Sequence, residues 1–155
     1  MPSFDSTLYA DQLASELSLH VRPSAKLQQC PVRMFRVSYT LAGTEAAADV
    51  INLGFPKLSN GYVIPEMSRV TDTGGGGDTD CDFTLQKVNT AGTAVALTAA
   101  ASVDNNSVPF ARPSTPVVAP FTDTDYLRVL LSSTDAVVAG GVLLFEIAYY
   151  SENAS

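Results

Sequence analysis

The amino-acid sequence predicts an all-β protein, an antiparallel β-sandwich or barrel of roughly seven or eight strands. From Arg33 onward, apolar and polar side chains alternate with a period of two, which is typical of strands with one face in a core. Gly, Pro, Asn and Asp residues interrupt this alternation about every ten residues, as turns do in such folds. Hydrophobic residues make up 46% of the 155-residue chain, which is enough for one core.

The first expected strand is "RMFRVSYTL", residues 33–41. Its inward set is Phe35, Val37, Tyr39 and Leu41. The next strands are expected in "DVINLGF" (49–55), with Ile51, Leu53 and Phe55 inward, and in "GYVIPEMSRV" (61–70). Pro65 cannot donate a hydrogen bond to a ladder, so it predicts a sheet edge or a β-bulge. Residues 43–49 are expected to form either one helical turn or an extended, turn-like connection.

The middle of the chain predicts β-hairpins. "CDFTLQKV" (81–88) places Cys81, Phe83 and Leu85 inward, and "TAVALTAAASV" (93–103) follows it after the turn "NTAGT". The four glycines at 74–77 are expected at the tip of a hairpin that leads into the strand with these residues.

The last two strands are expected in "DYLRVLLS" (125–132) and "GGVLLFEIAYY" (140–150), joined by a loop of hairpin length. Before them, four prolines in residues 105–121 exclude a regular helix and favour an extended crossing. One short edge strand is expected there, at Val117 and Val118.

The first 32 residues differ from the rest and predict an N-terminal arm ahead of a β-sandwich domain at 33–155. Tyr9, Leu13 and Leu17 share one stripe of a possible short amphipathic helix. The arm is expected either to pack on its own domain or to lie along a neighbour, with Leu8, Tyr9, Leu13 and Leu17 as its docking residues. Without residues 1–30 the domain is expected to fold but to assemble less well.

A formal net charge of -7 argues against nucleic acid or an anionic membrane as the main partner. The chain contains no apolar run of the roughly 20 residues that a membrane span needs. Its N-terminus lacks the pattern of a signal peptide, so we expect a protein that is made and used without export.

The run "DTDCDF" is the first stretch that suggests a binding site, because calcium loops also place acids at alternate positions. Counted from Asp78, the positions that need Gly and Glu hold Phe83 and Asn89 instead. The strand period places Asp78, Asp80 and Asp82 on a solvent face, and we predict no metal site.

Catalytic sites are equally hard to assemble. The single histidine, His20, lies in the arm, and Cys30 and Cys81 are expected as thiols rather than as a disulfide framework. Four acids are candidates for a carboxylate pair, but no spacing selects two of them: Glu66, Asp123, Asp125 and Glu146. We therefore predict neither an enzyme nor a cofactor. The absence of Trp weakens a sugar-binding role, although Tyr149 and Tyr150 are available, with one of the two facing inward.

The segment from Tyr39 to Val70 resembles small virion proteins encoded beside the major capsid gene in many tailed bacteriophages. In those, a strand ending in "YTL" leads to "D-x-I-x-L" and then to "G-x-x-I-P/D-x-x-S-x-V". The matching residues are Tyr39, Thr40, Leu41, Asp49, Ile51, Leu53, Gly61, Ile64, Pro65, Ser68 and Val70. The glycines at 74–77 depart from this pattern.

The resemblance implies a jelly-roll-like β-sandwich and a virion structural role, with no catalytic residues. The implied function is a capsid decoration (cement) protein, made in the host cytoplasm, which binds the major capsid protein on the capsid surface as a homo-oligomer. The alternatives are a minor tail or portal-vertex protein and a carbohydrate-binding module on the virion surface.

Overall fold

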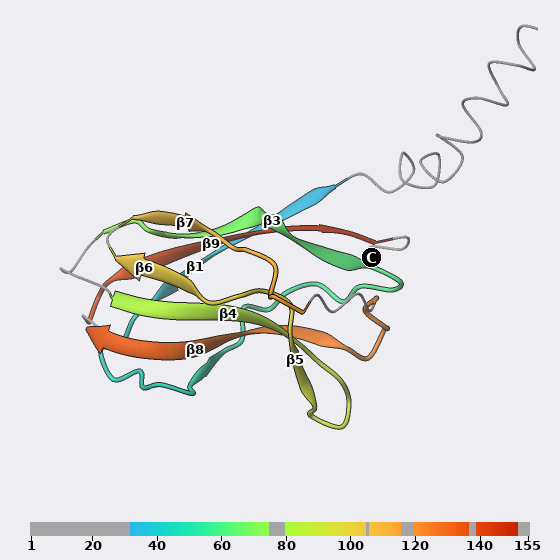
Figure 1. The fold of residues 1–155 in the computed structure, drawn as a ribbon, viewed down its shortest axis with the longest axis horizontal. Helices are drawn as coiled ribbons and strands as arrows, with labels where there is room; N and C mark the ends of the chain where they lie inside the picture. The colour runs from blue at the N-terminus through green and yellow to red at the C-terminus, as the bar shows by residue number, and fades with distance from the viewer. Residues whose placement is uncertain (1–31, 75–79, 105, 116–119, 137–138, 152–155) are drawn as a thin grey trace, which may run out of the picture. The chain divides into compact units, whose positions relative to one another are not determined.

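The computed structural model describes residues 32–74, 80–104, 106–115, 120–136 and 139–151 (Figure 1). Several sequence-based predictions fall outside these residues and stay predictions: the arm at 1–32 except for its last residue, with its docking residues, His20, Cys30, the glycines at 75–77, Asp78, and the strand at Val117 and Val118.

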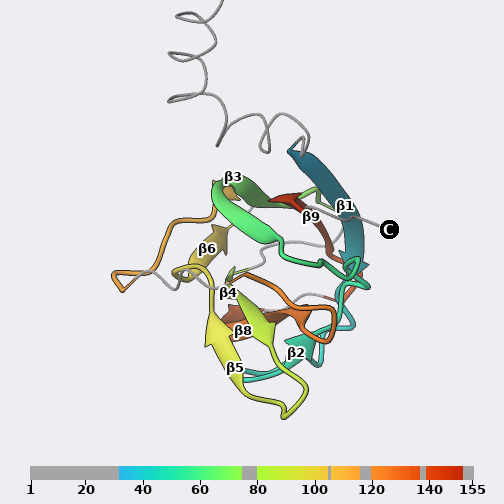
Figure 2. The same ribbon diagram turned by 90° about the vertical axis from the view of Figure 1, so that its right-hand side faces the viewer.

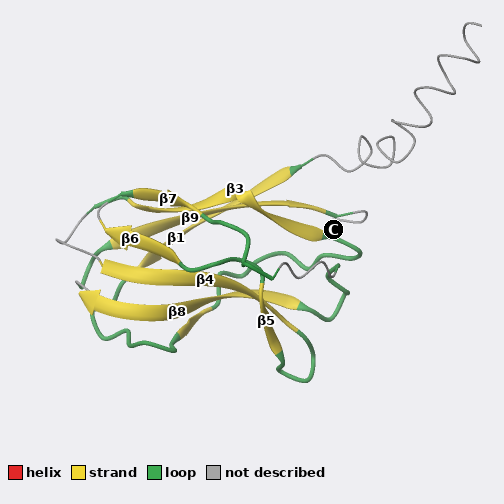
Figure 3. Ribbon diagram, in the orientation of Figure 1, coloured by secondary structure: helices red, strands yellow, loops and turns green. Residues whose placement is uncertain are grey.

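The described chain is all-β and consists of two antiparallel sheets, which form the two layers of a sandwich (Figures 2 and 3). Sheet A has the order β1-β9-β3-β7, with bounds β1 Arg33–Thr40, β9 Val142–Tyr150, β3 Tyr62–Asp72 and β7 Ser107–Pro109. Sheet B has the order β2-β8-β4-β5, and β6 also pairs with β4; the bounds are β2 Val50–Ile51, β8 Tyr126–Ala136, β4 Asp80–Val88, β5 Ala94–Ala96 and β6 Ala101–Asp104. The predicted sandwich is confirmed.

The pairing follows the plan of one long hairpin wound into two layers. β1 pairs with β9, β2 with β8, β3 with β7, and β4 with both β5 and β6. The contacts that close the winding are β3 with β9 and β8 with β4. Strands from the two halves of the hairpin thus alternate within each sheet, which is the arrangement of a jelly roll.

Two of the predicted hairpins are wrong. β3 lies in sheet A and β4 in sheet B, so these two strands do not form a hairpin. β8 and β9 also lie in different sheets, so they do not form a hairpin either. Alternation assigns each side chain an inward or outward face. Both sheets of a sandwich point their inward side chains at the same core, so alternation does not tell which sheet a strand belongs to. Loop length alone could not identify the partner strand either.

The hairpin around residues 89–93 is confirmed, but its second strand is interrupted. The side chain of Asn89 accepts hydrogen bonds from the N–H groups of Ala91 and Thr93 (3.0 and 2.9 Å), which closes the turn between β4 and β5. The predicted strand at 93–103 divides into β5 and β6. Between these two strands, the Thr98 hydroxyl accepts the Leu85 N–H at 3.0 Å.

Between β1 and β3, one expected strand is shorter than predicted, and the choice between a helical turn and a turn-like connection is decided. The strand expected at 49–55 keeps only Val50–Ile51 in the ladder, although Leu53 is buried as predicted. Residues 43–49 form no helix: the Glu45 carboxylate accepts the N–H groups of Ala42 and Gly43 (2.6 and 2.9 Å), which holds a turn-like loop.

The core lies between the two layers. Phe83 of β4 and Phe145 of β9 meet edge to face, with ring centroids 5.6 Å apart, and so join the sheets. The inward residues predicted for β4 are confirmed, since Cys81, Phe83 and Leu85 are all buried. A sandwich of this kind positions its two outer sheet faces rigidly. The outer face of sheet A contains a groove with charged residues and two exposed methionines.

Candidate interaction surface

The outer face of sheet A is organised in rows that run across its four strands. One row contains Arg36, Glu146, Arg69 and Pro109, which are partners in the β1-β9, β9-β3 and β3-β7 ladders. The next row contains Ser38, Leu144, Thr71 and Ser107, and its Thr71 and Ser107 hydroxyls bond at 2.7 Å. We call the surface formed by these two rows, together with Met34, Glu66 and Met67, the sheet A face.

A long β-bulge, with four residues opposite one, shapes one end of the sheet A face. Partner positions jump from Ile64–Ala148 to Arg69–Glu146, so residues 65–68 of β3 lie opposite the single residue Ile147 of β9. Pro65 is buried at the start of the bulge, where its missing N–H costs no ladder bond. The sequence predicted an edge or a bulge at this residue, and the structure shows the bulge.

Ser68 holds the bulge in place. Its buried hydroxyl donates to the Ile64 carbonyl at 2.8 Å and accepts the Ala148 N–H at 2.9 Å, while its own carbonyl accepts the Phe110 N–H. The side chain thus satisfies backbone groups that the register jump leaves without ladder partners. Glu66 and Met67 are pushed outward as a result, and both are exposed.

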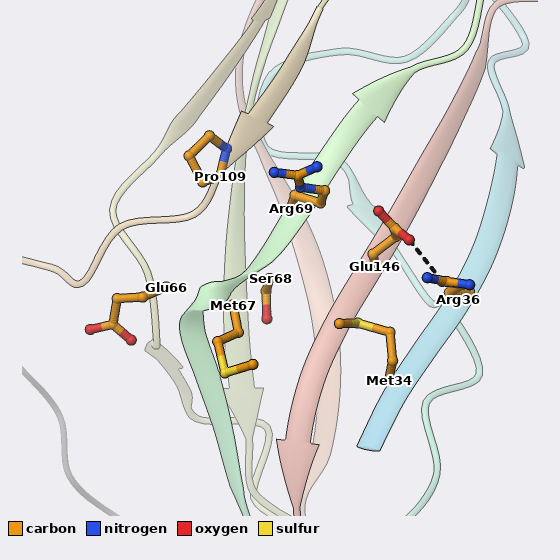
Figure 4. A pocket seen from close by; sticks show the side chains of 8 residues that line it. All are labelled: Met34, Arg36, Glu66, Met67, Ser68, Arg69, Pro109 and Glu146. Atoms are coloured by element: carbon orange, nitrogen blue, oxygen red, sulfur yellow. Dashed lines mark ion pairs between the residues drawn. The ribbon is translucent and has the colours of Figure 1, made fainter. Parts of the chain in front are cut away.

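The bulge borders a shallow groove of about 290 Å³, lined by Met34, Arg36, Glu66, Met67, Ser68, Arg69, Pro109 and Glu146 (Figure 4). Met34 of β1 and Met67 of β3 lie on either side of β9. These two side chains are 44% and 54% exposed, so the groove presents two large apolar groups to solvent. The groove thus combines two adaptable thioethers with a set of charged groups.

Ion pairs hold most of the charges of this groove. Arg36 contacts Glu146 with Nε and Oε1 2.7 Å apart, and Arg112 pairs with Glu66. A hydrogen bond from its own backbone N–H, together with Arg112, keeps the pKa of the Glu66 carboxyl below its usual value, although desolvation opposes this shift. Both glutamates are therefore occupied by arginines, an arrangement that suits surface structure better than acid–base chemistry.

The other two candidate acids lie elsewhere. Asp123 lines a separate hollow with Phe121 and Thr122. Asp125 is buried, with Oδ2 3.5 Å from the Lys87 ammonium and 2.8 Å from the Thr122 N–H. Burial opposes ionisation of Asp125, but the hydrogen bonds from Thr122 and the charge of Lys87 outweigh it, so its pKa lies below the usual value. Lys87 also donates to the Pro120 carbonyl, which makes this a structural tie between β4 and the segment before β8.

The remaining sequence candidates form no site among the described residues. Asp82 is half-buried on β4 opposite Ser102, and no three His, Cys, Asp or Glu residues of the described chain gather closely enough to hold a metal ion. Within the same residues, no helix has the length and apolar character of a membrane span. Tyr149 faces the core as one of the two terminal tyrosines had to, and Tyr150 lies against Tyr62 with ring centroids 5.2 Å apart.

Comparison with solved structures finds the same fold in a phage particle. A chain in a structure entitled "Capsid of Ralstonia phage GP4" superposes with a TM-score of 0.55 and 20% sequence identity. The match covers 81% of this chain and 86% of that chain. No family model and no curated protein sequence matches the chain. At this identity the likeness shows the fold.

Sequence reasoning placed some of the groove residues correctly but did not bring them together. Alternation put Met34 and Arg36 on the outer face of the first strand, and Glu146 was recognised only as one of four candidate acids. Met67 and Arg69 were missed as surface candidates. The one available signal was Pro65, which predicts an edge or a bulge but does not show how many residues a bulge contains or which side chains it turns outward.

Proposed function

We propose that this chain is a non-enzymatic structural protein of a tailed-phage virion, and specifically a capsid decoration protein that binds the major capsid protein. The observation that carries the proposal is the fold match, because it extends over 81% of this chain and 86% of the capsid-structure chain. The resemblance of Tyr39 to Val70 to small virion proteins is an independent support. This segment contains β2 and most of the bulged strand β3.

A decoration protein acts by adding contacts between capsid subunits, and the jelly roll suits that task. Its core is filled by side chains from both sheets, so its outer faces keep their shape when they meet a lattice. A stable contact of this kind buries on the order of 1,600 Å² in total. The sheet A face supplies apolar and arginine side chains for such a contact, and a symmetric oligomer would repeat it.

The N-terminal arm is proposed as a second contact. Leu8, Tyr9, Leu13 and Leu17 would dock against neighbouring subunits through apolar burial, which must offset roughly 1–2 kcal/mol for each residue that becomes ordered. Removal of residues 1–30 is expected to leave a folded domain with weaker shell binding. Circular dichroism and co-sedimentation of the truncated protein check the two parts separately.

The direct test is binding to capsid shells that lack this protein, taken from the phage that encodes it. We expect the purified chain to co-sediment with the shells, to saturate at a fixed ratio to capsid subunits, and to raise the temperature at which the shells break. If the chain neither binds such shells nor occurs in purified virions, the proposal is wrong. Binding at a single vertex or to tails only would instead support the minor tail or portal-vertex alternative.

A further inference from the structure

Arg69 differs from the other arginines of the sheet A face. Arg36 and Arg112 each contact a glutamate, whereas Arg69 has no carboxylate within 4.0 Å among the described residues. Figure 4 shows its guanidinium extending toward Pro109 of β7, away from Glu146. Since Glu146 lies between Arg36 and Arg69 in the same cross-strand row, that row contains two positive charges and one negative charge.

The surplus positive charge is notable because the chain as a whole is acidic, with a formal net charge of -7. The Glu66–Arg112 pair beside the row is neutral overall and does not offset it. A partner group that complements this place must therefore be an anion. A guanidinium offers a planar fork of donors that matches the two oxygens of a carboxylate.

Apolar side chains lie next to this charge. Met34 and Met67 are exposed in the same groove, and Leu144 is half-buried in the adjoining row. Methionine and arginine are enriched at protein interfaces, and a flexible thioether adapts to the side chain that it meets. An anion that brings an apolar neighbour would use both features of the surface.

We propose that the sheet A face binds a peptide segment of a partner protein, in which an Asp or Glu side chain contacts Arg69 while a neighbouring apolar side chain packs on Met34 and Met67. The inference rests on the proposed function for the identity of that partner, the major capsid protein. The Ser68-held bulge fixes the distance between the two contacts, because it sets where Met67 projects relative to Arg69.

The charge pattern also disfavours a symmetric contact between two copies of this face. If two copies met face to face about a two-fold axis, the surplus charge of one row would meet the same surplus on the other copy. The resulting repulsion disfavours such a dimer, whereas a carboxylate from a different protein is attracted. We therefore assign the face to a partner protein and not to a second copy of this chain.

The test measures shell binding of variants whose fold is verified by circular dichroism. Arg69→Glu is expected to weaken binding on the order of tenfold or more, as loss of a central interface arginine does. Arg69→Lys keeps the charge but loses the fork, so we expect an intermediate loss. Lys57→Glu is the matched control, since it makes the same change of charge on an exposed loop residue and should change binding less than about twofold.

A second pair of variants tests the apolar contact. Met67→Glu places a charge in the groove and is expected to weaken binding on the order of tenfold. Val50→Glu is its control, because Val50 is 51% exposed on sheet B and so matches Met67 in exposure. A photo-cross-linking residue at position 67 should capture a capsid-protein segment that contains Asp or Glu.

The outcomes separate the two levels of the proposal. If the wild-type chain fails to bind shells, the proposed function fails. If the wild-type chain binds but Arg69→Glu and Met67→Glu bind as well as their controls, the function stands and the sheet A face is not the docking surface. A change in the oligomeric state of Arg69→Glu in free solution, or a cross-link to a second copy of this chain, would overturn the assignment to a partner protein.

Discussion

Replacing Ser68 with Ala removes one hydroxyl that serves two backbone groups at the bulge. The Ala148 N–H and the Ile64 carbonyl lose partners at 2.9 and 2.8 Å, and Ala148 is fully buried, so water cannot readily replace the hydroxyl. An unsatisfied buried group costs about 1–3 kcal/mol in stability. For a domain of this size, that corresponds to a fall in melting temperature of roughly 4–12 °C.

The assay is thermal and urea unfolding of Ser68→Ala beside Ser38→Ala. Ser38 has the same side chain on the same outer face but is exposed, so its replacement should change stability by less than about 0.5 kcal/mol. The urea midpoint of Ser68→Ala should fall with an unchanged slope, because the surface exposed on unfolding stays the same. Equal stability of the two variants would refute the role that we assign to Ser68 at the bulge.

Three further predictions concern the interior. Phe145→Ala removes the ring that meets Phe83 between the sheets and should cost about 3–5 kcal/mol in chemical unfolding. Gly61→Ala should lower the free energy of unfolding by about 1–3 kcal/mol, because a Cβ would lie 2.6 Å from the Tyr150 carbonyl oxygen and the backbone must shift. A melting temperature at or above that of the wild type would contradict this contact. The lowered pKa of Asp125 means that its ionised form stabilises the fold above the unfolded-state pKa of about 3.9 and that this contribution is lost as the pH falls through the folded-state value. Asp125→Asn should therefore be less stable than wild type at pH 6, and the gap should narrow toward pH 3 in urea titrations; a gap that is independent of pH would argue against the assignment.

The candidate surface was only partly accessible from the sequence. Its two glutamates were recognised as isolated acids, and Met34 and Arg36 were placed outward, but the relation between Arg69 and Glu146 depends on the register of β3 against β9. That register contains a jump of several residues at the bulge. Alternation is lost across such a jump. The sequence therefore could not show which residues surround Met67, or that Arg69 has no carboxylate partner among the described residues.

By itself the sequence determined the all-β fold class and the inward set of most strands, as in the alternation of Phe35, Val37 and Tyr39. These properties are local, because the direction of each side chain follows from the two-residue period of its own strand. Only the tertiary structure decided which sheet each strand joins, that β3 and β4 and likewise β8 and β9 belong to different layers, and which outward residues form one surface. Strand partners in a wound hairpin are far apart in sequence. Which strands pair depends on the apolar surface that both sheets bury together, and a short window of residues does not contain that information.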